Sequence, residues 1–113
     1  MNCNEVVKFV SENKSRINKV IKELYRESLT VSSYLFDKKL LIYNNELVVR
    51  NHVGEWSQEE TYGDAICIYR VRGSDEGFTD DEAVESLMDR FDANSVTDSI
   101  VERYTRFEEL ELE

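Results

Sequence analysis

The chain has 113 residues, of which 41% are hydrophobic, and a formal net charge of −10. A chain of this length is expected to form one domain, residues 1–113, with a single core. No segment reaches the roughly 18 consecutive apolar residues of a membrane span, and the N-terminus has no apolar signal-peptide core. We therefore expect a soluble cytoplasmic protein without a membrane partner.

The first predicted element is a helix over residues 4–27. Apolar side chains recur there at helical spacing, and oppositely charged residues lie four positions apart on the polar side. Asn2 and Asn4 are both suited to cap its start. The apolar stripe consists of Val6, Val10, Ile17, Val20, Ile21 and Leu24.

The central part of the chain predicts four antiparallel strands. The first covers residues 30–36, which are rich in β-branched and aromatic side chains, and a polar turn at 37–39 follows. Strands at 40–43 and 46–50 flank Asn44-Asn45, a pair that tolerates the positive φ angles of a type I′ hairpin turn. The fourth strand, 65–72, begins with a continuous apolar run, which predicts a central position with Cys67 in the core.

Two acidic helices are predicted after the strands. The sequence Thr79-Asp80-Asp81-Glu82 has the pattern of a capping box, in which Thr79 caps the first of them. Ser95 and Asp98 are expected to cap the second, and residues 108–113 are expected to fray. The predicted fold is α+β: an N-terminal helix, a four-stranded antiparallel sheet, and two acidic C-terminal helices on one face. Their expected buried residues are Val84, Leu87, Met88 and Phe91, then Ile100, Val101, Tyr104 and Phe107.

Catalytic patterns are missing from the sequence. His52 is the single histidine, and neither it nor the two cysteines has the spacing of a metal site. Phosphate-binding glycine loops and nucleophile elbows are also absent. We therefore expect a protein that is not an enzyme and that needs no metal or cofactor.

The longest irregular segment, residues 54–64, contains the only tryptophan. Trp56 and Tyr62 are side chains that often anchor protein interfaces, and Glu59 and Glu60 lie between them. The alternative is that Trp56 folds back to cover one end of the core. Both interpretations stay open at the level of the sequence.

The charge is unevenly distributed along the chain. Residues 1–53 carry nine basic and six acidic groups, a net charge of +3, whereas residues 54–113 carry five arginines and 18 acidic groups, a net charge of −13. In the first acidic helix, Asp81, Glu85 and Asp89 follow at intervals of four, Asp92 continues the same side, and Glu82 lies beside it. Four helical residues advance about 6 Å, close to the separation of successive phosphates along a nucleic-acid strand.

These features favour a protein-binding function. The first interpretation is an inhibitor or modulator that mimics a nucleic acid and occupies the basic surface of a nucleic-acid-binding protein, without binding nucleic acid itself. In size, acidity and lack of catalytic motifs, the chain is similar to small inhibitors that bacteriophages and mobile elements encode against host proteins. The alternative is a small acidic chaperone or adaptor that binds a client through the sheet or the Trp56 loop. Both are compatible with a homodimer.

Overall fold

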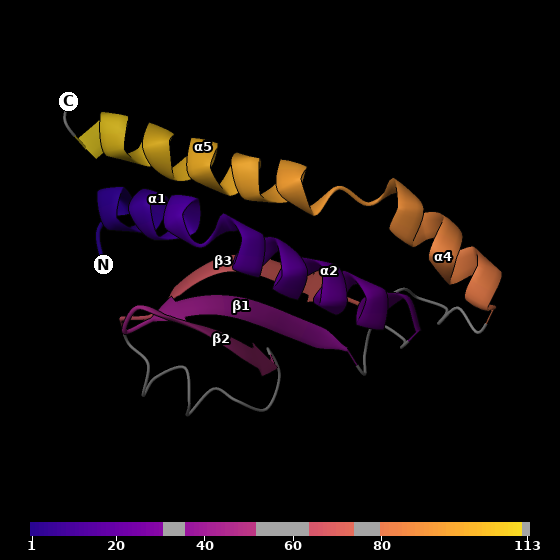
Figure 1. Cartoon of the computed structure of the whole chain (residues 1–113). Helices are drawn as coiled ribbons and strands as arrows, with labels where there is room; N and C mark the ends of the chain where they lie inside the picture. Colours follow the sequence, from indigo (N-terminus) through magenta and orange to yellow (C-terminus); the bar gives the residue numbers. More distant parts are fainter. Residues whose placement is uncertain (31–35, 52–63, 74–79, 112–113) are drawn as a thin grey trace.

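The protein folds into a layer of helices on one face of an antiparallel sheet (Figure 1). The computed structural model describes residues 1–30, 36–51, 64–73 and 80–111. No helix in these ranges is long and apolar enough to cross a bilayer. The helices and the antiparallel sheet confirm the predicted α+β class. The elements are α1 (Cys3–Glu12), α2 (Lys14–Thr30), β1 (Asp37–Tyr43), β2 (Glu46–Asn51), β3 (Ile66–Arg72), α4 (Asp81–Arg90) and α5 (Ala93–Glu111).

The predicted first helix is two helices joined end to end. Asn2 caps α1 by accepting a hydrogen bond from the Glu5 backbone N–H at 2.8 Å. At Asn13, both the backbone N–H and the side-chain amide donate to the Phe9 carbonyl, at 3.0 and 2.8 Å. Asparagine competes in this way with regular helical hydrogen bonding, so the prediction of one continuous helix was wrong at this residue. The apolar stripe nevertheless continues through Ile17 on α2.

The asparagine hairpin is confirmed. Asn44 and Asn45 have φ angles of 52° and 60°, and they join β1 to β2. A turn with two positive φ angles matches the twist of the flanking strands. The register pairs Leu40 with Val49 and Ile42 with Leu47, so that these side chains face the helices and pack in the main core.

The polar segment at 37–39, predicted as a turn, begins β1 instead. Asp37 pairs across the sheet with Arg72 on β3, and its carboxylate accepts two hydrogen bonds from the Arg70 guanidinium at 2.9 and 2.6 Å. This charge pairing stabilises a strand start that lacks apolar residues. Of the strand predicted at 30–36, Thr30 belongs to α2 and Phe36 is buried beside β1, while 31–35 lie outside the described residues. The described sheet has three strands.

Among the described strands, whose order is β2-β1-β3, the strand β3 lies at an edge of the sheet and not at the predicted central position. Its register against β1 pairs Leu41 with Cys67 and Leu40 with Tyr69, which leaves Ile68 as the extra residue of a β-bulge. Because of the bulge, consecutive apolar residues can face the same side of the sheet. The continuous apolar run therefore does not require that both faces of the strand are buried. Cys67 is exposed, so its predicted core position was wrong.

The caps of the C-terminal helices differ from the predicted ones by a few residues. Asp80 caps α4 by accepting from the Glu82 N–H at 2.9 Å, and Thr79 lies outside the described residues. Asp92, rather than Ser95 with Asp98, caps α5, because its carboxylate accepts from the Ser95 N–H and hydroxyl at 3.3 and 2.8 Å. The helix α5 continues to Glu111, into the segment expected to fray.

The apolar residues form two clusters. The main core joins α1, α2, the sheet and α5, and Ile100 contributes from α5. A smaller cluster of Leu29, Val84 and Met88 joins α4 to the end of α2. The helix α4 is therefore anchored separately from the main core. Phe107, which was predicted to be buried, is 44% exposed.

Candidate protein-binding surface

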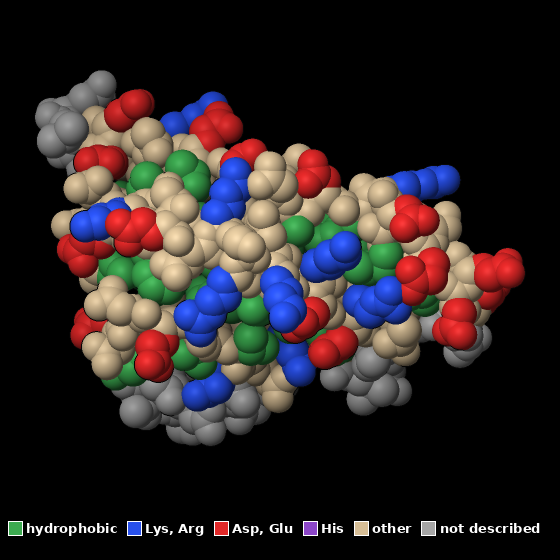
Figure 2. Space-filling view, viewed as in Figure 1, with side chains coloured by type: hydrophobic (Ala, Val, Ile, Leu, Met, Phe, Trp, Pro, Cys, Tyr) green, Lys and Arg blue, Asp and Glu red, His purple; other side chains and the backbone are tan. Residues whose placement is uncertain are grey.

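The helix α4 presents its carboxylates to solvent and its apolar side to α2. Val84 and Met88 are buried, whereas Asp81, Glu82 and Asp89 are exposed. The first two carboxylates lie in the first turn, where the positive end of the helix dipole favours negative charge. The Tyr25 and Phe91 rings stack at 4.0 Å between centroids and hold the other end of the helix against α2. At the α4 end of the molecule, acidic side chains gather on the surface (Figure 2).

The basic and acidic halves of the chain neutralise one another in part. Arg26 on α2 forms an ion pair with Glu85 on α4. At the start of α2, Lys14 pairs with Asp98 on α5, with 2.5 Å between the Lys14 Nζ and a carboxylate oxygen. Both pairs are exposed, so each is expected to contribute less than about 1 kcal/mol to stability. The ion pair with Arg26 shows that Glu85 has a partner within the protein.

Asp92 also has a role within the fold. Its Oδ1 accepts from the Asn94 N–H at 3.0 Å, in addition to the two hydrogen bonds from Ser95. The hydrogen bonds from the Ser95 hydroxyl and N–H, supported by Asn94 and the nearby Lys14 charge, lower the pKa of the Asp92 carboxyl. Capping of α5 therefore accounts for an acidic residue at this position.

Replacement of Asp92 by alanine is expected to lower the melting temperature, because the first turn of α5 loses its cap. Asparagine keeps the acceptor oxygen and is expected to restore most of the loss. Since the folded-state pKa of Asp92 is lowered, its contribution is present above the ordinary pKa of 3.8 and is lost as pH falls through the lowered value. Thermal unfolding monitored by circular dichroism at several pH values measures both effects. Equal melting temperatures for wild type and D92A would contradict the assignment.

On α4, three carboxylates remain without a described intramolecular partner. Asp81, Glu82 and Asp89 are exposed, and no side chain among the described residues forms an ion pair with them. We call these three residues the acidic surface. An α-helix rises about 1.5 Å per residue, so the acidic surface extends about 12 Å along α4. Its charges are available to a cationic partner.

The other predicted contact residues lie in the segment 52–63, outside the described residues. They comprise Trp56, Glu59, Glu60 and Tyr62. His52 lies in the same segment. In the ranges that the structure does describe, no group of three or more His, Cys, Asp and Glu side chains could hold a metal ion.

A groove between β3 and α5 was missed by the sequence analysis. Its walls include Tyr69 and Arg70 from β3 and Ser99 and Arg103 from α5. Tyr104 connects the walls, because its hydroxyl donates to the Cys67 carbonyl at 3.4 Å. Burial raises the pKa of the Tyr104 phenol, so this hydroxyl remains a donor at neutral pH. The available sequence signal was the placement of arginines within the acidic half of the chain.

Comparison of the chain with protein-family models, with curated proteins and with solved structures finds no match.

Proposed function

We propose that this protein binds a basic, nucleic-acid-binding surface of another protein through the acidic surface of α4, and that it thereby competes with the nucleic acid. The observation that carries the proposal is the set of exposed carboxylates of Asp81, Glu82 and Asp89, for which the described part of the fold supplies no cation. Lysine and arginine side chains that bind phosphates also bind carboxylates. The protein would then act as an inhibitor or modulator of its partner.

The arrangement of the charges supports this mode of binding. The fold uses Glu85 and Asp98 in ion pairs, yet it leaves the acidic surface unneutralised on a helix that lies at one end of the molecule (Figures 1 and 2). Like charges along one side of a helix slightly weaken it, so intrinsic helix stability gives little reason to keep Asp89 beside Glu85. A cationic partner gives such a reason. Binding of this kind should weaken steeply as salt increases.

The test compares two variants of equal charge. In D81N/E82Q/D89N, the acidic surface loses three charges, and in the control E5Q/E12Q/E23Q, three exposed carboxylates of α1 and α2 are lost. Both variants change the formal net charge from −10 to −7. The fold should survive in each, because exposed charge changes alter stability by a few tenths of a kcal/mol.

The measurement is the affinity for a partner that is captured from the native host cytosol by the wild-type protein. We expect the α4 variant to bind about tenfold more weakly or worse, which corresponds to three exposed ion pairs of about 0.5 kcal/mol each, and the control to bind like wild type. The partner's own nucleic acid should displace the wild-type protein. Equal affinities for the two variants, or binding that nucleic acid does not affect, would disprove the proposal.

The alternative function is that of an adaptor or chaperone that binds a client through the sheet or the Trp56 loop. An interface of that kind depends on apolar contact, so its affinity should change little between low and moderate salt. The same titration of affinity against salt therefore separates the two functions.

A further inference from the structure

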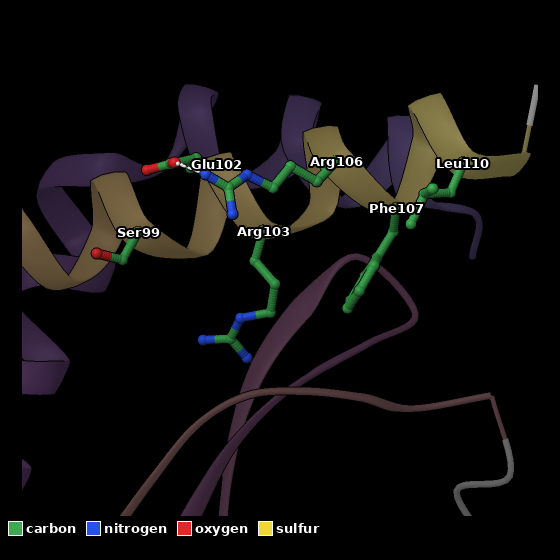
Figure 3. A pocket seen from close by; sticks show the side chains of 6 residues that line it. All are labelled: Ser99, Glu102, Arg103, Arg106, Phe107 and Leu110. Atoms are coloured by element: carbon green, nitrogen blue, oxygen red, sulfur yellow. Dashed lines mark hydrogen bonds and ion pairs between the residues drawn. The ribbon is translucent and has the colours of Figure 1, made fainter.

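The groove between β3 and α5 extends beyond the hollow already described. A second hollow adjoins the first along α5, and the two share Ser99 and Arg103 in their walls. Figure 3 shows Arg103 and Phe107 directed from α5 toward the strands, with Leu110 at the far end. Together the two hollows form a groove along α5, which faces β3 in the first hollow and is lined by α5 alone in the second.

The edge strand offers backbone groups for pairing. Within the described sheet, β3 is hydrogen-bonded to β1 on one side and to no strand on the other. The Tyr104 hydroxyl is 3.4 Å from the Cys67 carbonyl oxygen, a long and weak hydrogen bond. A strand of seven residues is about 23 Å long, enough for an extended peptide to add as a further strand.

The charge of the groove is opposite to that of the molecule. Four of the five arginines in residues 54–113 lie on β3 and the facing part of α5, and that half of the chain contains no lysine. Two carboxylates neutralise part of this charge, Asp37 beside Arg70 and Glu102 beside Arg106 at 2.7 Å. These four arginines are Arg70, Arg72, Arg103 and Arg106, of which Arg72 pairs with Asp37 and lines neither hollow. For the three arginines that line the groove, Arg70, Arg103 and Arg106, the local balance with these two carboxylates is +1 in a protein of net charge −10.

Arg103 is the arginine best placed to bind a ligand. It is exposed, and it has no ion-pair partner among the residues that the structure describes. A guanidinium group can bind a carboxylate through two parallel hydrogen bonds. Next to it, Phe107 and Leu110 are 44% and 65% exposed, and they offer an apolar contact at the same end of the groove.

We infer that this groove binds an extended acidic peptide segment of a partner protein, which adds to β3 as a fourth strand. A carboxylate of the segment binds Arg103, and a neighbouring apolar side chain packs on Phe107. The inference concerns another surface and the opposite charge from the proposed function, so either can fail alone.

Other occupants fit the groove less well. A second copy of the chain, paired edge to edge around a two-fold axis, would bring the arginine-rich groove of one copy against that of the other. A nucleic-acid strand would have to approach a protein of net charge −10. A short acidic peptide carries less charge than such a strand, and its backbone satisfies the edge of β3.

The test uses a short synthetic peptide in which valine and glutamate alternate, titrated into the isotopically labelled protein to millimolar concentration. We expect saturable shifts in the NMR signals of the backbone amides of β3 and of residues 99–110. A peptide with lysine in place of glutamate should cause at least tenfold smaller shifts at the same concentration. A peptide with proline at alternate positions should also fail, because proline cannot donate to the strand edge.

Two substitutions assign the roles of the side chains. R103Q removes the charge and the guanidinium group but keeps a polar side chain, and it should weaken peptide binding about fivefold or more. R90Q, on α4, makes the same charge change at an exposed arginine outside the groove and should bind like wild type. The inference is wrong if the acidic peptide causes no shifts in β3, if the lysine peptide binds equally well, or if R103Q and R90Q behave alike. Shifts caused only by single-stranded oligothymidylate would show a phosphate-binding groove instead.

Discussion

Replacement of Ile100 by alanine is expected to lower the free energy of unfolding by about 2–5 kcal/mol. The Ile100 side chain is 1% exposed, and it projects from α5 into the core that α1, α2 and the sheet share. The substitution removes three buried carbon atoms and leaves a cavity in contact with all of these elements. Because total stabilities of small domains are about 5–15 kcal/mol, this one change should remove a large part of the total.

Urea unfolding followed by circular dichroism measures this effect, and Leu110 on the same helix supplies the control. Leu110 is 65% exposed, so L110A should change the free energy of unfolding by no more than about 0.5 kcal/mol. If the I100A and L110A variants unfolded at the same urea concentration, α5 would not be part of the cooperative core.

Sequence patterns predicted the structural features that depend on residues close together in the chain. The pair Asn44-Asn45 fixes a hairpin because two adjacent residues adopt positive φ. The buried residues Val84 and Met88 follow from helical periodicity on α4. In both cases, the physical cause lies within a few residues along the chain and can therefore be recognised in the sequence.

The errors arose where distant residues decide the local structure. The sequence of segment 37–39 is typical of a turn. In the fold, however, Arg70 and Arg72 neutralise Asp37 across the sheet, and the segment belongs to a strand. The apolar run of β3 is typical of a central strand. The bulge at Ile68 that accounts for this run depends on pairing with β1, which the local sequence does not reveal. These partners are separated by about thirty residues in sequence, and periodicity contains no information about them.

The candidate site shows the same division. The spacing of the acidic residues predicted a row of carboxylates along α4, but it did not predict which of them form ion pairs within the protein. The ion pair of Glu85 with Arg26 depends on the packing of α4 against α2, which only the fold reveals. The groove lined by Arg70 and Arg103 likewise joins a strand and a helix that are distant in sequence.

Replacement of Met88 by alanine is expected to loosen α4 without unfolding the rest of the protein. Met88 is 5% exposed in the small cluster with Leu29 and Val84, which is separate from the main core. Loss of a buried methionine costs about 2 kcal/mol or more, so the backbone amides of α4 should exchange with solvent about thirtyfold faster. Amides beside Ile100 should exchange at nearly the wild-type rate.

The same variant tests whether the acidic surface acts as a fixed array. M88A keeps every charge, so a partner that responds only to net charge should bind it like wild type. A partner whose basic groups match the positions of Asp81 and Asp89 must first restore α4, and its affinity should fall by up to the same thirtyfold. The S86A variant, with its change on the exposed side of α4, is the control and should match wild type in both measurements. Faster exchange throughout the molecule in M88A would show that α4 belongs to the main cooperative unit. Loss of most exchange protection in α4 with unchanged affinity would show that the partner recognises charge without a defined arrangement.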